Sequence, residues 1–218
     1  MRQFLLLRPE PGLSASAEQA RQLGLKVIAC PLFRIEPVAW RGPDPADFDA
    51  LLLTSANAVQ FGGPELDRLK ALPVHAVGEA TAEAARKAGF GVASTGTGNA
   101  GDLLAALPST LRLLHLAGQD HRETGRDLDR RVVYRSAEID DPPLPPLDGL
   151  VVAVHSPRAG QRLAEFAVQR DQTMLVAISR QAADAAGHGW ERIEVAGEPN
   201  DSSLLALAAM LCHTSPRQ

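Results

Sequence analysis

The sequence predicts an α/β protein made of two similar domains, each with a parallel sheet. Three observations lead to this prediction: one motif occurs twice, short apolar runs alternate with helical segments, and two stretches interrupt this alternation. The chain has 218 residues, which suffices for two domains of about 100 residues each, near the commonest domain size.

The repeat is visible at three places along the chain that share one offset. The matching pairs are Ser55 with Ser156, Gly78 with Ser179 and Asp102 with Ser203, each 101 residues apart. A constant offset over three separate matches indicates two half-proteins of equal build. Two such halves usually leave a cleft between them, and clefts are where ligands bind.

The expected strands are short and continuously apolar: Phe4–Leu7, Val27–Ala29, Ala50–Leu53, Val74–Val77, Leu111–Leu116, Leu150–Val154 and Met174–Ile178. Such runs are typical of parallel strands that are buried on both faces. The helical segments that alternate with them are Ser16–Leu23, Ala56–Phe61, Ala80–Ala88, Gly101–Ala106, Ala159–Gln169, Gln181–Ala186 and Ser203–Leu211. This alternation predicts parallel sheets with right-handed crossovers, and Gly24, Gly89 and Gly187 mark helix ends.

Two extended stretches divide the chain into domains. They are Pro31–Val38 and Val132–Ile139, the second followed by the proline-rich Asp141–Pro146. The simplest arrangement is an insertion, in which residues 1–34 and 139–218 form one domain and residues 39–131 form the other. Residues 35–38 and 132–138 are then linker strands. Side by side, they would form a two-stranded β-ladder that acts as a hinge.

Composition excludes several classes of function. The net charge of −4 argues against nucleic acid as a partner. No apolar stretch approaches the roughly 18 residues of a membrane span, and the N-terminus enters a short strand without a signal-peptide pattern. Cys30 and Cys212 are too few and too far apart for a disulfide framework or a zinc site. We therefore expect free thiols in a reducing compartment, the cytoplasm.

Small polar residues recur where an expected strand gives way to a helix. They are Thr54, Ser55, Asn57, Gly78, Thr81, His155, Ser156, Arg158, Ser179 and Gln181. Ligands of open parallel sheets bind at the carboxyl ends of the strands, and helix N-termini suit anions such as carboxylates. The alternative is that Ser55, Thr81 and Ser156 are only helix N-caps or turn residues.

The loop after Leu116 contains a further candidate group. Gly118 suits a tight turn, while His121 and Arg122 add positive charge; the alternative is a solvated helix start. A dinucleotide fingerprint, a Walker A motif and HExxH are all missing, and the six histidines lack metal spacing. Ser55 has no nucleophile elbow around it, which makes a hydrolase improbable. We expect neither a metal nor a cofactor.

Tyr134 is the single tyrosine of the chain and belongs to the second linker strand. A hinge strand would line the cleft. The tyrosine hydroxyl has a reference pKa of about 10, so it stays protonated and can donate a hydrogen bond or a proton to a leaving hydroxyl. The alternative is a ring that packs and a hydroxyl that contacts water.

Taken together, these segments resemble the uroporphyrinogen-III synthase family over nearly the whole chain. The resemblance rests on Leu5–Pro9, Leu53–Val59, Ala76–Ala82, Val133–Arg135, His155–Ala159 and Ala177–Ser179. It implies two α/β domains of the flavodoxin or Rossmann kind, joined by a two-stranded ladder, with the active site in the cleft. The family's lyase reaction dehydrates and cyclises hydroxymethylbilane and inverts ring D to give uroporphyrinogen III, without a cofactor. That substrate carries many carboxylates, which suits a cleft of N–H groups and small hydroxyls.

The resemblance also implies roles for individual residues. Tyr134 matches the family's linker tyrosine and is the expected catalytic group, and Thr81 matches a threonine of the cleft. The expected substrate-binding residues are Arg8, Ser55, Asn57, Gly78, Thr81, Gly118, Arg122, Ser156, Arg158 and Ser179. The chain departs from the family at Arg180-Gln181-Ala182, where small hydroxyl residues are frequent, and at Ala117-Gly118-Gln119, which lacks an arginine-glycine start. Arg180 and Arg122 could bind substrate carboxylates at these two points instead.

Two readings of the function follow. In the first, the chain is this lyase, a monomer that receives hydroxymethylbilane from hydroxymethylbilane synthase. In the second, it is a non-catalytic, two-lobed binding or sensory module for a small anionic metabolite. Tyr134 and Thr81 favour the enzyme, because a module without catalysis could do without Tyr134.

Overall fold

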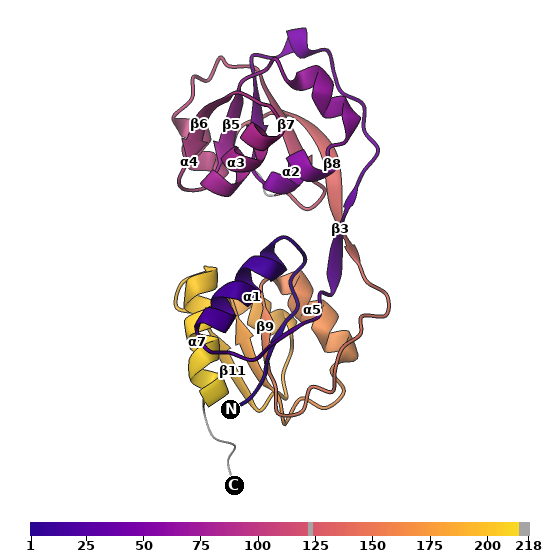
Figure 1. Cartoon of the computed structure of the whole chain (residues 1–218), viewed down its shortest axis with the longest axis vertical. Helices are drawn as coiled ribbons and strands as arrows, with labels where there is room; N and C mark the ends of the chain where they lie inside the picture. The colour runs from indigo at the N-terminus through magenta and orange to yellow at the C-terminus, as the bar shows by residue number, and fades with distance from the viewer. Residues whose placement is uncertain (122–123, 214–218) are drawn as a thin grey trace. The chain divides into compact units, whose positions relative to one another are not determined.

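The computed structural model of the chain describes residues 1–121 and 124–213. It divides into two compact α/β units (Figure 1). Unit 1 contains Met1–Arg34 and the chain from Glu138 onward, and unit 2 contains Ile35–Ala137. Each unit has its own sheet and its own core, so each is described by itself.

Unit 1 is a five-stranded parallel sheet between two pairs of helices. Its strands, in the order β11-β10-β9-β1-β2, are Arg192–Val195, Met174–Ala177, Val151–Val154, Phe4–Leu6 and Val27–Ala29. Its helices are α1 (Gly12–Gln22), α5 (Pro157–Phe166), α6 (Arg180–Ala185) and α7 (Asp201–His213). Phe4 and Leu6 pack under α1 and α7, while Leu5 and Leu7 pack under α5 and α6. Strands buried on both faces explain the continuously apolar runs of the sequence.

Unit 2 has a six-stranded sheet. In the order β3-β8-β7-β4-β5-β6, its strands are Phe33–Pro37, Asp129–Glu138, Leu113–Gly118, Ala50–Leu53, Val74–Val77 and Val92–Gly96. Its helices are α2 (Ala56–Phe61), α3 (Glu79–Lys87) and α4 (Ala100–Ala105), with short 3₁₀ turns at Pro45–Asp47 and Pro64–Leu69. Leu51 and Leu53 face the core under α2 and α3, and Ala50 and Leu52 face α4.

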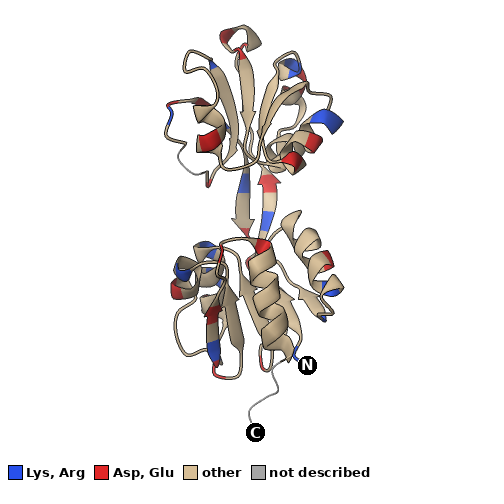
Figure 2. Cartoon of the chain, turned by 90° about the vertical axis from the view of Figure 1, so that its left-hand side faces the viewer, with Lys and Arg blue, Asp and Glu red and all other residues tan. Residues whose placement is uncertain are grey.

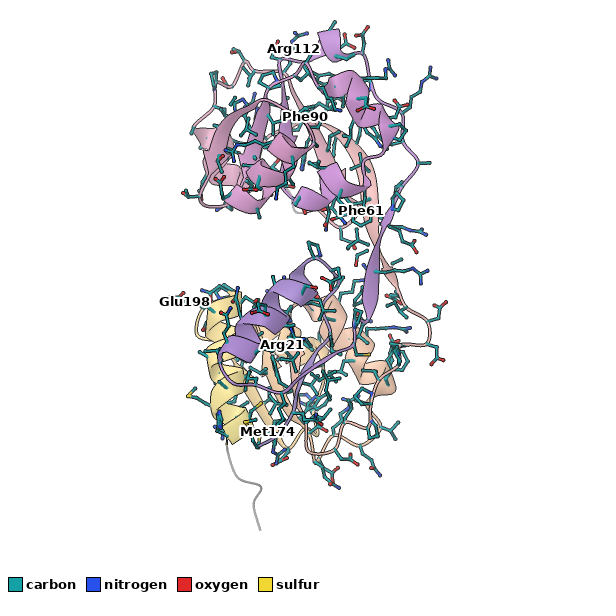
Figure 3. The ribbon with its side chains drawn as sticks, viewed as in Figure 1. Arg21, Phe61, Phe90, Arg112, Met174 and Glu198 are labelled. Atoms are coloured by element: carbon teal, nitrogen blue, oxygen red, sulfur yellow. The ribbon has the colours of Figure 1, made fainter. Side chains whose placement is uncertain are left out.

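Figure 3 draws the side chains of both units, including buried and exposed examples. Met174 is buried in unit 1 and Phe90 in unit 2, whereas Arg112 is half exposed and pairs with Asp49. Charged residues of both signs are interspersed on each unit (Figure 2).

The strand order shows how the sequence repeat is folded. The order β11-β10-β9-β1-β2 of unit 1 matches β6-β5-β4-β7-β8 of unit 2, because β9 and β4 are 101 residues apart and both are central. In this match β1 corresponds to β7. The N-terminal strand β1 is thus in one sheet with β9, since Phe4 is opposite Val151; this is the neighbour it needs if residues 1–34 and 139–218 share a domain.

The predicted two-stranded ladder is also confirmed. β3 and β8 are neighbours, and the hydrogen bonds from Val38 N to Val133 O and from Ile139 N to Leu32 O give an antiparallel register. Arg135 and Glu36 form an ion pair across the two strands at 3.0 Å. These two strands carry the chain from one unit into the other and back. Hinge motion remains a prediction.

Several predicted boundaries were wrong. The helix expected to reach Gln169 ends at Phe166, where Ala167 leaves the helical conformation, and β8 begins three residues before the expected linker. The edge strands β6 and β11 were not predicted. Both are half exposed and carry polar residues, so they lack the continuously apolar pattern that identified the other strands.

Candidate functional site

A cavity lies at the carboxyl ends of the strands of unit 2. Its volume is about 490 Å³, and it is lined by Thr54, Ser55, Val77, Asn99, Ala100, Gly101, His115, Gly118, Asp120, His121, Thr124 and Tyr134. These residues come from the carboxyl ends of β4 and β5, from β7 and the loop after it, from the middle of β8, and from the start of α4. Of the predicted site residues, the cavity brings together Ser55, Gly118 and Tyr134.

Tyr134 and Gly118 form one structural element. The two residues are opposite each other in the β7–β8 ladder, next to an irregularity at Ala117, and Gln119 N donates to Tyr134 O at 2.9 Å. A Cβ on Gly118 would lie 2.6 Å from the Tyr134 ring and 2.9 Å from its hydroxyl oxygen. Only glycine leaves room for the ring in this position. In the described part of the chain, no group is hydrogen-bonded to the Tyr134 hydroxyl, so it remains available to a ligand.

Ser55, Ser156 and Ser179 serve as helix N-caps. Their Oγ atoms accept hydrogen bonds from the N–H groups of Asn57, Ala159 and Ala182, at 3.2, 3.1 and 3.3 Å. The alternative reading, that such residues are helix N-caps, is therefore correct as far as the lone pairs of these hydroxyl oxygens are concerned. The hydroxyl hydrogen is not used by the cap and can still be donated to a carboxylate.

Asn57, Gly78 and Thr81 do not line the cavity. Gly78 caps α3 with φ of 80°, a conformation that favours glycine, and Thr81 is buried. The Oδ1 atom of Asn57 is buried without a partner among the described residues. Arg122 lies outside the described residues.

His115 is the main residue that sequence reasoning missed. It is 1% exposed, and its Nε2 lies 3.1 Å from Thr54 Oγ1 while Arg130 Nε donates to its Nδ1 at 3.4 Å. Burial, with smaller effects from the charges of Arg130 and His121, lowers the pKa of His115 to about 4. The ring is therefore neutral near pH 7. A lone histidine inside an apolar strand gave no signal in the sequence.

The buried neutral ring leads to a prediction about stability. Unfolded His115 binds a proton near pH 6.5, but the folded protein does so only near pH 4. The free energy of unfolding should therefore fall as the pH drops from about 6.5 to 4, by about 3 kcal/mol from this residue alone. Urea unfolding of the wild type and His115→Leu across this range would measure it.

The variant is the control for other groups that titrate in the same range. Burial also lowers the pKa of His75, and both proteins keep His75. The loss should be smaller in His115→Leu. An equal pH dependence of the two proteins would contradict a buried neutral His115.

In unit 1, the corresponding strand ends carry an ionic cluster. Arg8 Nη1 donates to Ser16 Oγ at 2.8 Å and lies 3.2 Å from Asp201 Oδ1. Ser16 Oγ donates to the other oxygen of Asp201 at 2.6 Å, and His155 Nε2 is 2.9 Å from Oδ1. Burial acts to raise the pKa of Asp201, but these hydrogen bonds and the Arg8 charge outweigh it and lower the pKa. Arg8 is thus held in place by Asp201, a residue the sequence did not indicate.

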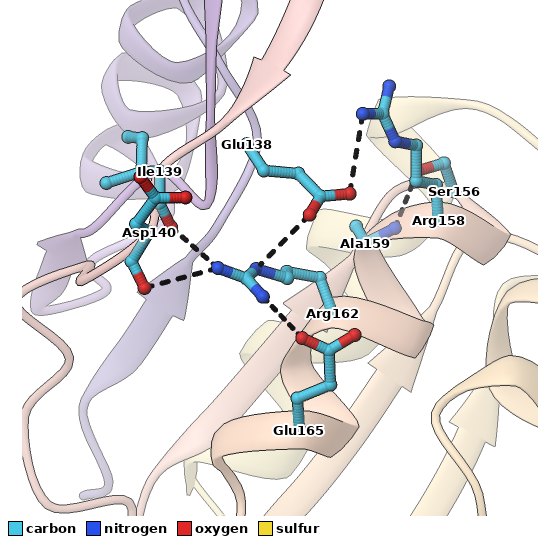
Figure 4. A network of polar contacts seen from close by, with 8 residues as sticks. All are labelled: Glu138, Ile139, Asp140, Ser156, Arg158, Ala159, Arg162 and Glu165. Atoms are coloured by element: carbon cyan, nitrogen blue, oxygen red, sulfur yellow. Dashed lines mark hydrogen bonds and ion pairs between the residues drawn. The ribbon is translucent and has the colours of Figure 1, made fainter.

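Arg158 belongs to a network at the end of β8 (Figure 4). Its guanidinium donates to Glu138 Oε1 at 3.4 Å and stacks over the Phe33 ring at 4.6 Å. Arg162 contacts the same carboxylate at 3.9 Å, donates to the carbonyls of Ile139 and Asp140, and pairs with Glu165. Arg158 thus already has protein partners at this position. Its predicted contact with a substrate stays a prediction.

Within residues 1–121 and 124–213, no group of three or more His, Cys, Asp or Glu side chains is placed to hold a metal ion. In the same ranges, no helix is long and apolar enough to cross a membrane. Cys30 and Cys212 are both buried free thiols.

Comparison with known proteins identifies relatives of this chain. The family model described as uroporphyrinogen-III synthase HemD matches residues 14–206. The crystal structure of uroporphyrinogen-III synthetase from Helicobacter pylori is similar, with 19% identity, a TM-score of 0.69 and coverage of 97% of this chain and 100% of that one. Two structures of uroporphyrinogen III synthase from Thermus thermophilus are 17% identical, with TM-scores of 0.49 and 0.39, and cover 96% and 95% of this chain and 99% and 97% of theirs. Comparison with curated proteins found no match.

Proposed function

Because the chain belongs to the uroporphyrinogen-III synthase HemD family, a family of hydro-lyases, we propose that it dehydrates and cyclises hydroxymethylbilane with inversion of ring D to give uroporphyrinogen III. One observation supports this most directly. The Tyr134 hydroxyl lines the same cavity as the hydroxyl groups of Thr54 and Ser55. A proton donor and two hydrogen-bond donors thus border one space.

The proposed chemistry starts at the hydroxymethyl group of the substrate. As its carbon–oxygen bond breaks, the leaving hydroxide needs a proton, and Tyr134 supplies it so that water departs. The carbon left behind is an electron-poor centre, which the substituted carbon of ring D attacks to give a spiro intermediate. The bond from that ring carbon to its old bridge carbon then breaks, and the bridge carbon bonds to the free carbon of ring D, so that the ring is inverted and the macrocycle closes. The proton returned to Tyr134 comes from the pyrrole carbon that formed the new bond. No other group has to be consumed.

Binding of the flexible substrate supplies much of the proposed catalysis. Holding the two ends of a chain in reacting geometry converts a rare encounter into a frequent one. The hydroxyls of Thr54 and Ser55 would donate to substrate carboxylates in unit 2. We propose that Arg8, Ser156, Arg158 and Ser179 of unit 1 contribute further carboxylate contacts. Asn57, Gly78 and Thr81 would then act by shaping the strand ends, since they do not line the cavity.

The direct test is the isomer of the product. Hydroxymethylbilane closes spontaneously to the type I product, so type III reports catalysis. We expect the purified protein, incubated with freshly made hydroxymethylbilane, to give type III as the main isomer after chromatographic separation. Buffer alone and heat-unfolded protein are the controls.

A folded protein that yields only type I at the rate of the buffer control would overturn the proposal. Saturable binding of the substrate without type III would then support the non-catalytic binding module instead. A monomeric state, a cytoplasmic location and supply of the substrate by hydroxymethylbilane synthase remain predictions.

A further inference from the structure

Thr54, His115 and Arg130 form a chain of polar contacts across three neighbouring strands. β8, β7 and β4 are adjacent in the sheet of unit 2. Arg130 is opposite His115, and His115 is opposite Leu52, two residues before Thr54. The contacts are 3.4 Å from Arg130 Nε to His115 Nδ1 and 3.1 Å from His115 Nε2 to Thr54 Oγ1.

The direction of each hydrogen bond follows from the chemistry of the groups. A guanidinium only donates, so Nδ1 of His115 must be the accepting nitrogen. In the neutral ring the hydrogen is then on Nε2 and is donated to Thr54 Oγ1. The reverse, with Thr54 donating to Nε2, would leave both ring nitrogens without hydrogen, which is an imidazolate. The Thr54 hydroxyl hydrogen must therefore point to another acceptor.

Among the described residues, no acceptor is hydrogen-bonded to the Thr54 hydroxyl. The Thr54 side chain lines the cavity, and no other group in residues 1–121 and 124–213 is hydrogen-bonded to its hydroxyl. Among the described residues, Arg130, Asp120 and His121 lie near His115, and the His121 ring is 6.4 Å from the His115 ring in an edge arrangement. His121 Nδ1 is 3.0 Å from the carbonyl of Gly118, to which it must donate. No hydrogen bond joins the His121 ring to the Thr54 hydroxyl in the described part of the chain.

The fold itself does not need a histidine at this place. β1 of unit 1 corresponds to β7 of unit 2. His115 is opposite Leu52 in β4, and the residue 101 positions after Leu52 is Ala153 in β9. Leu6 is opposite Ala153, so Leu6 is the equivalent of His115. Leu6 is fully buried in its core. A buried imidazole costs stability relative to such a leucine unless it is hydrogen-bonded. The repeat thus provides an internal comparison that separates the fold from the site.

We propose that Arg130 and His115 are positioning residues that hold Thr54 as an obligatory hydrogen-bond donor to a carboxylate oxygen of the ligand in the unit 2 cavity. The proposal rests on the proposed function for the identity of that ligand. Hydrogen bonds in a chain polarise one another inside a protein, so the Arg130 charge strengthens the Thr54 donor. Because the hydrogen of this hydroxyl needs an acceptor, the site favours a carboxylate oxygen of the ligand at this point.

Kinetics of matched variants test the coupling. Thr54→Val should raise KM for hydroxymethylbilane about tenfold or more, as expected for one lost hydrogen bond to a charged group, with kcat changed less. Thr54→Ser keeps the hydroxyl and should stay near the wild type. His115→Leu, which installs the residue of unit 1, should also raise KM. The double variant should be no worse than Thr54→Val, because the two side chains act through one hydroxyl.

Additive effects of the two substitutions, or a His115→Leu variant with unchanged KM, would overturn the proposal and leave His115 as a core residue. Nitrogen-15 NMR of the imidazole gives a second test that needs no turnover. We expect the Nε2–H tautomer of His115 in the wild type near pH 7. The Nδ1–H tautomer would contradict the relay. Because this measurement does not use catalysis, it separates failure of the relay from failure of the proposed function.

Discussion

Replacing Tyr134 with phenylalanine is expected to lower kcat at least about tenfold while the protein stays folded. A positioned general acid typically contributes about 10²–10⁴-fold, and the lower bound allows a substrate carboxyl group or a water molecule to deliver part of the protons. The ring should keep its packing against the core that contains Val133 and Leu116. Product analysis should show a larger share of the spontaneous type I isomer.

The control for this variant is His121→Gln, which removes a further ring of the cavity lining that could exchange a proton. It should leave kcat within a few-fold of the wild type. Near wild-type type III formation by a folded Tyr134→Phe protein would mean that Tyr134 only packs. A large loss in His121→Gln instead would assign the proton donor to His121.

Gly118→Ala should lower kcat by a comparable factor, although it removes no polar group. The added Cβ would overlap the Tyr134 ring, with atoms 2.6 Å apart, so the ring and its hydroxyl must move. Displacement of a catalytic group by about 1 Å can cost ~10²-fold in rate. Steady-state kinetics should show the loss in kcat, and near-ultraviolet circular dichroism should report a changed environment of the single tyrosine.

Gly91→Ala is the matched control in the same unit, because no atom lies within 4 Å of a Cβ added there. It should have wild-type kinetics. The double variant Gly118→Ala with Tyr134→Phe should be no slower than the slower single variant, since both act through one hydroxyl. A Gly118→Ala protein with unchanged kcat would show that the ring position is not needed for catalysis.

The candidate site could be predicted only in part. The strand-end rule identified Thr54 and Ser55, the loop after Leu116 indicated Gly118, and the linker strand indicated Tyr134. These four residues do line one cavity. The same rule also selected Thr81, which is buried, and Gly78, whose positive φ shapes the start of α3. Strand ends mark one edge of a sheet, but the rotation of each helix decides which side chains reach the cavity. That rotation depends on packing, which the spacing of residues does not contain.

The sequence by itself determined the α/β class, the repeat, the pairing of the first strand with the strand at Val151, and the ladder of β3 and β8. These features follow from local patterns: apolar runs long enough for a strand buried on both faces, and a constant offset. Only the tertiary structure decided the partners of His115 and Asp201. Thr54 is 61 residues from His115, and His155 is 46 from Asp201. Contacts across such separations are made by neighbouring strands and helices, and a side chain's pKa and hydrogen-bond direction are set by those neighbours.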